Sequence, residues 1–523
     1  MSALLPKFLL AFLSIGLVLE LGCGRGNHAP RSAIDMAMQP EDSSTLKQEG
    51  QFNTEAYDAI VENPFVQALQ QPQSTFSIDV DTASYANVRR MIRQGQLPPH
   101  GAVRIEELVN YFTYDYAEPS DEHPFSVNVE RADCPWQAEH QLMRIGIKGK
   151  SIDYRERPSS NLVFLIDVSG SMMDSNKLPL VQSAMSLLVK QMRTEDRIAI
   201  AVYAGASGLA LPSTTAENAD QILTAIEKLQ AGGSTNGGAG IQLAYDVARK
   251  HFIDEGINRV ILCTDGDFNV GTTNQSELVE MIEQQAKSNV FLTVLGFGDG
   301  NLKDSTMEKL ADKGNGNYAY IDSLLEARKV LVQQLGATLT TIAKDVKIQV
   351  DFNPQQVKAY RLIGYENRRL ENQDFRDDAK DAGEIGAGHT VTAFYEIVPT
   401  SAASPEPNAR PSEFVSPTLT AKSDLSTLLT VNLRYKQPTA NESSEFQMRL
   451  DSQQYQADAS DDFYFASAVV GYGMLLRDSQ MKGTTNWDWV ISTAEKHRGD
   501  DDQGLRNEFV QLAKAASELS RPE

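Results

Sequence analysis

Short apolar runs alternate with segments of helical spacing between residues 158 and 335. The first run, Leu162–Ile166, is short and continuously apolar, which favours a strand that is buried on both faces. From Lys177 to Gln191, apolar residues then recur every three or four positions, as on one face of a helix. Because this order repeats, the pattern predicts a mainly parallel, doubly wound sheet with helices on both faces, in the α/β class.

The same pattern places the individual elements of this region. The expected strands are Leu162–Ile166, Arg197–Tyr203, Arg259–Cys263, Asn289–Phe297 and Asn317–Ile321. The expected helices are Lys177–Gln191, Ala219–Leu229, Gly240–Phe252, Ser276–Lys287, Asp304–Lys313 and Leu324–Leu335.

The pattern on both sides of this region is different. Alternating apolar and polar residues predict strands at Phe125–Val129 and Met143–Ile147 before it, and at Thr390–Val398 and Leu428–Tyr435 after it. We expect these strands to share one antiparallel, sandwich-like system, so that the α/β region is an insertion in an α+β or β-sandwich-like module. Helical spacing returns at the end of the chain, in Asp462–Arg477, Asn486–Lys496 and Gly504–Leu519.

These changes of pattern divide the chain into six parts. They are an export signal at 1–23, a flexible polar tether at 24–70, an N-terminal segment at 71–157, the α/β domain at 158–335, a β-rich domain at 336–458 with a Pro-rich insert at 401–421, and C-terminal helices at 459–523. Within the tether, Tyr57–Leu69 is more apolar than the rest, and we expect it to dock onto the folded body.

The first residues of the chain resemble an export signal with a bacterial lipobox. Lys7 supplies the positive charge, and Phe8–Leu19 is an apolar run of 12, too short to span a bilayer by the rule of about 20 residues. Leu21-Gly22-Cys23 then resembles the lipobox, which implies that Cys23 is the lipidated first residue of the mature protein. Glu20 departs from the aliphatic residue usual there, so an ordinary or uncleaved signal peptide is the alternative.

Candidate chemistry begins where the first apolar run ends. Asp167, Ser169 and Ser171 stand at alternate positions around Gly170, on a strand-to-helix turn. In an open α/β sheet this turn lies at the carboxyl edge of the strand, where ligands bind. Small oxygen ligands suit a hard cation such as Mg²⁺, although Ser and Asp are also preferred at helix N-termini, so a capped helix is the alternative.

Two later segments complete a recognisable pattern. The glycine-rich Gly232–Gly238 contains Thr235, and the strand Arg259–Cys263 is followed by Thr264-Asp265-Gly266. In this order, the three segments resemble the metal-ion-dependent adhesion site (MIDAS) of von Willebrand factor A (VWA) domains, over roughly residues 158–335. The resemblance implies that Ser169, Ser171 and Thr235 contact the metal directly, and that Asp167 and Asp265 act directly or through water. It also implies that the last coordination position is kept for an acidic group of a ligand.

The flanking segments resemble a family too. Phe76–Ile92, Leu97–Phe112, Gly364–Arg368 and Asp378–Pro399 are similar to the segments around the VWA domain in a bacterial VWA-domain lipoprotein family. Asp79-Val80-Asp81 looks like the start of a haloacid dehalogenase motif, but Ala83 stands where that motif requires Thr or Val. We therefore expect Thr82 and Ser84 to cap a helix instead. The helix predicted at Arg104–Phe112 has Ile105, Leu108 and Phe112 on one face.

Charge and cysteine usage narrow the possible partners. The net charge of −22 argues against nucleic acid or an anionic membrane surface as the main partner. Cys263 ends an apolar strand and is expected to be a buried free thiol, although a bridge to Cys134 stays open. Tyr203 and Phe268 are candidate aromatics at the rim of the metal site, with packing onto the sheet edge as the alternative.

These observations favour a binding module over an enzyme. The expected function is a Mg²⁺-dependent grip, with Mn²⁺ or Ca²⁺ as alternatives, on an Asp or Glu of a protein partner in the cell envelope. The lipid anchor would hold the protein to a membrane, the outer one facing the periplasm in a Gram-negative cell. The alternatives are a scaffold whose metal only staples loops and a metal-dependent hydrolase, for which no G-x-S-x-G, P-loop or placed general base is present.

Overall fold

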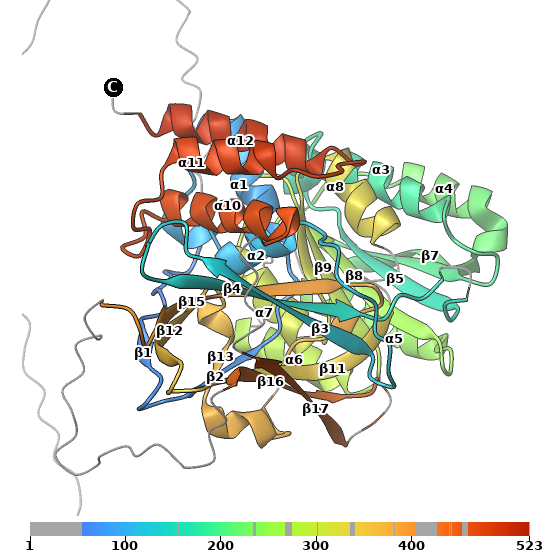
Figure 1. The fold of residues 1–523 in the computed structure, drawn as a ribbon. Helices are drawn as coiled ribbons and strands as arrows, with labels where there is room; N and C mark the ends of the chain where they lie inside the picture. The colour runs from blue at the N-terminus through green and yellow to red at the C-terminus, as the bar shows by residue number, and fades with distance from the viewer. Residues whose placement is uncertain are drawn as a thin grey trace, which may run out of the picture. The chain divides into compact units, whose positions relative to one another are not determined.

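A six-stranded, mainly parallel sheet and two antiparallel sheets, of five and six strands, carry the folded part of the chain (Figure 1). The computed structural model describes residues 55–153, 156–233, 237–266, 275–300, 302–334, 340–380, 382–403, 426–438, 440, 442–451 and 459–521. Cys23, Thr235 and Phe268 therefore lie outside the described residues.

The six-stranded sheet belongs to the α/β domain, and its strand order is β10-β9-β8-β5-β6-β7. The strands are β5 (Ser160–Asp167), β6 (Arg197–Tyr203), β7 (Ser207–Thr215), β8 (Ile257–Thr264), β9 (Phe291–Phe297) and β10 (Tyr318–Ile321). All pairs are parallel except β6 with β7. The sequence pattern missed β7, because this edge strand is largely exposed and has no continuous apolar run.

Helices cover both faces of this sheet, as the apolar strands predicted. They are α3 (Leu178–Val189), α4 (Ala219–Glu227), α5 (Gly237–Lys250), α6 (Gln275–Ala286), α7 (Asp304–Lys313) and α8 (Leu324–Arg328), which continues as a π-helical turn at Lys329–Gln333. In β5, Leu162 and Phe164 pack in a core with residues of α3 and α4, whereas Val163 and Leu165 pack in a second core with residues of α5 and α6. The α/β fold class is therefore confirmed.

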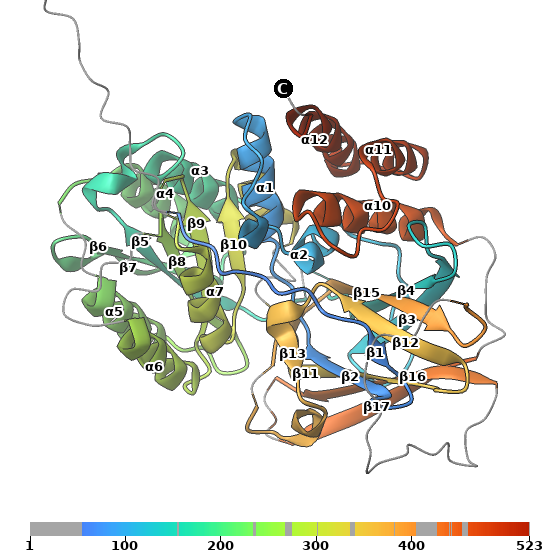
Figure 2. The ribbon, with the colours of Figure 1, turned by 90° about the vertical axis from the view of Figure 1, so that its left-hand side faces the viewer.

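The two antiparallel sheets lie together beside the α/β domain (Figure 2), and each contains strands that precede this domain in the sequence and strands that follow it. The first has the order β1-β12-β15-β4-β3, with β1 (Val66–Gln67), β3 (Phe125–Asp133), β4 (Gln141–Gly149), β12 (Val357–Ile363) and β15 (Thr390–Pro399). The second has the order β13-β2-β11-β16-β17, with β2 (Gln73–Ser77), β11 (Thr341–Phe352), β13 (Arg369–Leu370), β16 (Thr427–Lys436) and β17 (Ser443–Asp451), and β14 (Ile385–Gly386) pairs with β11.

Strand pairing shows that the α/β domain is an insertion, as the sequence predicted. β4 pairs with β15, and β2 pairs with β11, so each sheet joins a strand before residue 150 to one after residue 340. Side chains of both sheets, such as Phe76 and Ile145, share one hydrophobic core, which makes this β module a sandwich.

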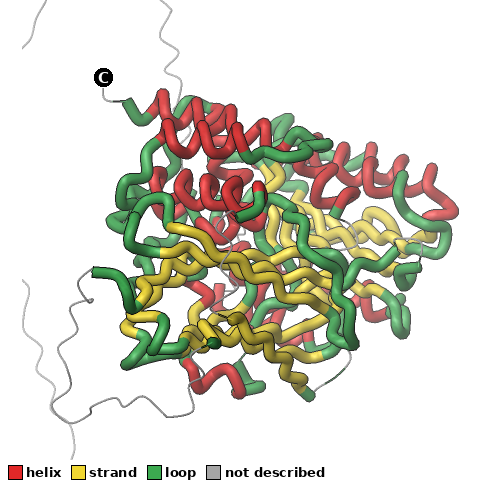
Figure 3. The backbone as a smooth tube through the Cα atoms, in the orientation of Figure 1, coloured by secondary structure: helices red, strands yellow, loops and turns green. Residues whose placement is uncertain are grey.

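Five helices of the accessory module share one hydrophobic core, and Figure 3 shows helices (red) above the strands (yellow) of the antiparallel sheets. They are α1 (Ala83–Arg93), α2 (Ile105–Asn110), α10 (Asp461–Leu476), α11 (Trp487–Lys496) and α12 (Leu505–Leu519). All residues of α2 are buried, including Glu106 and Glu107, rather than only its predicted apolar face. The capping expectation for α1 is wrong: Thr82 makes no side-chain capping bond, and the Ser84 hydroxyl donates to the Ala102 carbonyl at 2.7 Å.

Residues 55–67 form a strap that joins the α/β domain to the β module, as the apolar character of Tyr57–Leu69 predicted. At one end, the Ala56 amide donates to the Leu302 carbonyl at 3.1 Å. Further along, the Asn63 side chain donates to the Gly364 carbonyl at 2.8 Å, and β1 then pairs with β12. The part of the predicted tether from residue 55 onward therefore packs on the folded body.

Two smaller expectations concern cysteines and membrane spans. Cys134 and Cys263 are both buried free thiols, so the bridge between them that the sequence left open is absent. Among the described residues, no helix combines the length and the apolar character that crossing a bilayer requires.

Candidate metal site

The candidate site lies at the carboxyl ends of two neighbouring strands. Asp167 is the last residue of β5, and Asp265 follows directly after β8. The two strands are parallel, and their register sets Ile166 opposite Cys263, so both aspartates emerge at the same edge of the sheet. This edge is where open α/β sheets bind ligands.

The turn after β5 brings three of the predicted oxygen ligands together. The Ser169 amide donates to Oδ1 of Asp167 at 2.8 Å, and the hydroxyls of Ser169 and Ser171 lie 3.0 Å apart. Ser169 is buried and Ser171 is half-buried, so the second hydroxyl stands nearer to solvent. Asp167 thus orients the turn with one oxygen and leaves the other for a different role.

The glycine-rich loop is fastened to the same turn. The Gly232 amide donates to the Val168 carbonyl at 2.7 Å, and the Gly170 amide donates to the Gly233 carbonyl at 3.1 Å. Glycine is required at Gly233, whose φ of +90° lies in the left-handed region, whereas a Cβ at Gly170 or Gly232 would meet no clash. Thr235, the fourth predicted ligand, lies outside the described residues.

The second oxygen of Asp167 provides the test of whether these residues fit a cation. Asp167 is 0% exposed, and no well-aligned hydrogen bond reaches its Oδ2 from the described residues, although the Tyr203 hydroxyl lies close enough to act on the carboxyl. Burial raises the pKa of this carboxyl to about 6, and the nearby Asp265 adds to the rise, whereas hydrogen bonds from Ser169 and from the Tyr203 hydroxyl oppose it. A buried carboxylate oxygen without a partner is costly, and a bound cation would satisfy it.

The chemistry of the donor set is consistent with that test. Carboxylate and hydroxyl oxygens are the ligands that Mg²⁺ prefers, and neutral hydroxyls leave the ion with net positive charge. Among the described residues, no group of three or more His, Cys, Asp or Glu side chains could hold a metal ion. A site here therefore depends on the serine hydroxyls as well as on the aspartates.

One charged residue beside the site was given no role by the sequence analysis. The ammonium nitrogen of Lys177 lies 2.9 Å from Oδ2 of Asp265, and the two side chains are 5% and 0% exposed. Gly298, at φ +73°, makes room for the lysine stem, since a Cβ there would lie 2.4 Å from its Cε. The available signal was a lysine at the start of an apolar helix, because a buried lysine requires an acidic partner.

Of the two aromatic residues considered for the rim of the metal site, Tyr203 follows the alternative, which was packing within the fold. Tyr203 is 0% exposed and packs in the core between the sheet and its helices, so its interpretation as a rim residue is wrong. Phe268 lies outside the described residues. An apolar side chain that does stand near the site in solvent is Met173, which is 66% exposed, two residues after Ser171.

Comparison with known families matches three parts of the chain. Residues 161–334 match the family described as von Willebrand factor type A domain, and residues 51–144 match one described as von Willebrand factor. Residues 337–519 match a family described as "Uncharacterized protein YfbK, C-terminal".

Three individual proteins are similar to this chain to different extents. The YfbK protein of Escherichia coli (strain K12) is 44% identical over 471 residues, which cover 88% of this chain and 81% of that protein. The human inter-alpha-trypsin inhibitor heavy chain H3 is 29% identical over 164 residues, 30% of this chain and 18% of that protein. A solved von Willebrand factor type A structure from Catenulispora acidiphila has 13% identity and a TM-score of 0.44, and the match covers 76% of this chain and 98% of that one.

Proposed function

Because the chain belongs to the family of the YfbK protein, which joins a VWA domain to a YfbK-type C-terminal domain, we propose that it grips a protein partner through a divalent cation. A VWA domain is in general a protein-interaction or adhesion module. The proposal adds a metal, a ligand set and a type of contact to that general role.

The observation that carries the proposal is the state of Asp167. Its Oδ2 is buried without a well-aligned hydrogen bond from the described residues, and two serine hydroxyls 3.0 Å apart follow on the same turn. We propose that Ser169, Ser171 and Thr235 hold Mg²⁺ directly, and that Asp167 and Asp265 act directly or through water. When bound, the cation supplies a Lewis-acidic position that can accept a carboxylate oxygen from an Asp or Glu of the partner.

Lys177 favours an external carboxylate over a loop staple. Its ammonium pairs with Asp265 and so offsets one of the two negative charges that surround the site. A cation bound there keeps more of its positive charge and attracts an acidic group from outside. The scaffold alternative would instead require a further carboxylate of this chain at the last coordination position.

We propose that the protein acts in the bacterial cell envelope. The support is the N-terminal sequence, in which an apolar run of 12 residues is followed by Leu21-Gly22-Cys23. Lipidation of Cys23 would anchor the chain to a membrane, and residues 24–54 would connect that anchor to the folded body.

Calorimetric titration tests the metal directly. Mg²⁺ and Mn²⁺ are titrated into the full chain and into the double variant Asp167→Ala/Ser169→Ala, with the exposed Ser183→Ala as matched control. Binding to the parent and the control, with loss in the double variant, supports the site. Equal binding to all three proteins would place the metal elsewhere, and no binding to the folded parent would overturn the proposal.

A further inference from the structure

A second site candidate lies where the strap, the α/β domain and the β module meet. A partly open cavity of about 450 Å³ is lined by the strap, the start of α2, the first turns of α7 and the turn at residues 366–368. Its volume is in the range of small-molecule pockets, about 300–1,000 Å³. The residues that matter here are Asp58, Val61, Arg104, Glu106, Lys309 and Arg368.

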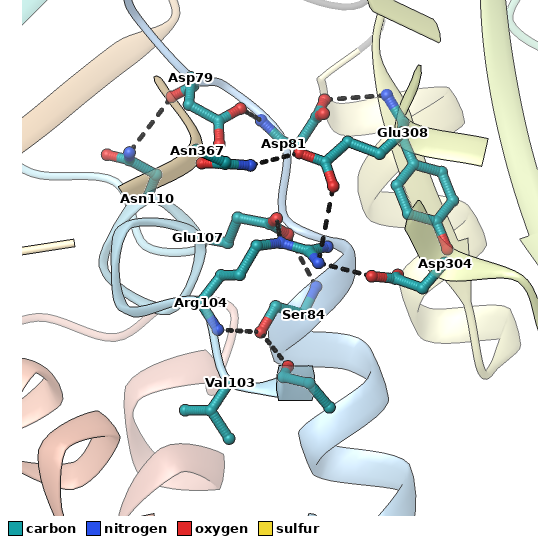
Figure 4. Close-up of polar contacts among 12 residues, drawn as sticks. Asp79, Asp81, Ser84, Val103, Arg104, Glu107, Asn110, Asp304, Glu308 and Asn367 are labelled. Carbon is teal, nitrogen blue, oxygen red and sulfur yellow. Dashed lines mark hydrogen bonds and ion pairs between the residues drawn. The ribbon is translucent and has the colours of Figure 1, made fainter. Parts of the chain in front are cut away.

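The cationic side chains of the wall are already neutralised. Arg104 donates to Glu107 and Asp304, as Figure 4 shows. Arg368 lies 2.8 Å from Asp312, and it also contacts Asp79 and Glu308 at 3.3 Å. Lys309 lies 3.4 Å from Asp58. No positive charge of this wall is therefore left to balance a further carboxylate.

Glu106 is the carboxylate that remains. It is 2% exposed, and its Oε2 is buried with no hydrogen-bond partner among the described residues, although the backbone amide of Glu106 itself donates to the carboxylate. The neighbouring cation Arg477 instead contacts Glu366 at 2.6 Å and donates to the Val103 carbonyl. Gly364, at φ +77°, preserves the space beside Glu106, since a Cβ there would lie 2.7 Å from Oε2.

A buried carboxylate oxygen without a partner is costly, and a strongly perturbed carboxyl in a cleft is a candidate for a functional site. Burial and the Glu366 carboxylate raise the pKa of Glu106 to about 7, whereas Arg477 lowers it and Asp79 raises it. The cost would be removed by a cationic hydrogen-bond donor within the cavity.

We propose that this cavity binds an ammonium or guanidinium group on a short aliphatic stem, with Glu106 as its counter-ion. The charge of the group is matched by the carboxylate that lacks a partner. The stem is matched by Val61 of the strap, which is 82% exposed at the cavity and offers an apolar surface. The group can belong to a free amine or to a Lys or Arg side chain of a partner protein. None of these residues belongs to the metal site.

The test uses small probes on the full chain. Butylammonium and butylguanidinium, with butanol as a neutral probe of similar size, are titrated at pH 8 and low salt and followed by ligand-observed NMR. Glu106→Gln removes the charge at nearly constant shape, and Glu217→Gln, an exposed acid on the α/β domain, is the matched control. We expect saturable binding of both cations to the parent and the control, and at least tenfold weaker binding to Glu106→Gln and of butanol.

A variant outside the buried network guards against a folding effect. Val61→Ser should weaken butylguanidinium by about threefold, because less apolar surface covers the stem, and should leave methylguanidinium unchanged. Blocked Gly-Lys-Gly binding at least as tightly as butylammonium would identify a partner side chain as the source, and binding of the free amine alone would identify a small molecule. Absence of saturable binding to the parent, or equal affinity for Glu106→Gln, would overturn the proposal.

Discussion

The ammonium of Lys177 and the carboxylate of Asp265 form a buried ion pair, 2.9 Å long, at the edge of the candidate metal site. A metal there would be bound beside a fixed positive charge. A unit charge a few ångströms away costs on the order of a few kcal/mol at the effective dielectric of such sites. Lys177 would therefore lower the cation affinity without contacting the cation itself.

Removal of that charge should strengthen metal binding. We expect Lys177→Met to bind Mg²⁺ ten- to a hundredfold more tightly than the parent in calorimetric titration, because the repulsion is gone and Asp265 regains its full charge. The exposed Lys190→Met is the matched control and should leave the affinity unchanged. Weaker binding in Lys177→Met would contradict this view and would mean that the lysine positions Asp265 for the metal.

Metal removal should act on stability through Asp167. Ligand that binds only the folded state at a hundred times its Kd stabilises that state by about 2.7 kcal/mol. We expect Mg²⁺ to raise the Tm of the parent by several degrees, and EDTA to reverse the rise. The Tm of Asp167→Asn should not respond to Mg²⁺ or EDTA. Without metal, this variant should be no less stable than the parent, because it removes a buried negative charge whose Oδ2 has no well-aligned hydrogen bond from the described residues. An equal response of Asp167→Asn would exclude Asp167 from the site.

Glu106 should make stability fall as pH rises. Its pKa is raised from 4.5 to about 7, first by burial and then by Glu366, so between these values the folded chain holds a proton that the unfolded chain has lost. The unfolded state binds fewer protons in this window, and the free energy of unfolding therefore decreases with pH. At about 1.4 kcal/mol for each pKa unit, the full loss above pH 7 is about 3 kcal/mol.

Comparison of Glu106→Gln with the parent isolates this effect. The variant cannot ionise, so it should be more stable than the parent above pH 7 and similar below pH 5, as measured by urea unfolding across that range. Glu217→Gln should track the parent at every pH. A constant difference between Glu106→Gln and the parent would show that the change in packing, rather than ionisation, sets its stability.

Local sequence was sufficient for the centre of the α/β domain and for part of the site. Leu162–Ile166 is apolar without interruption, and this requires burial on both faces whatever surrounds it. The bond from the Ser169 amide to Asp167 is equally local, because it spans two residues. The α/β domain could be predicted as an insertion because the alternating strands of the sandwich lie both before and after residues 158–335 in the sequence.

Contacts that depend on distant segments could not be predicted in this way. Lys177 reaches Asp265 across Gly298, and these residues come from three separate parts of the chain. Glu106 and Glu107 would face solvent on an isolated amphipathic helix, but the rest of the fold buries every residue of α2. Helix propensity and hydrophobic periodicity do not show which other segments will cover a helix. The cavity beside Glu106 could therefore not be predicted from the sequence.

Arg89 offers a final prediction, on how the α/β domain is held to the C-terminal helices. It is 1% exposed, and its guanidinium lies 2.7 Å from Glu326 of α8 and 3.0 Å from Glu508 of α12. It also makes a paired contact with Asp322, at the end of β10. One side chain of α1 thus neutralises carboxylates from two parts of the molecule.

Arg89→Met should leave these carboxylates buried without their main counter-ion. Breaking a buried pair costs about 3–5 kcal/mol, so we expect a large drop in the free energy of unfolding and faster hydrogen exchange in both α8 and α12. The matched control is Arg93→Met, one turn later on α1. That arginine also pairs with Glu508 but is 52% exposed, so its loss should cost at most about 1 kcal/mol. Faster exchange in α12 alone would show that Arg89 does not couple the two parts, because α8 would then keep its place without it.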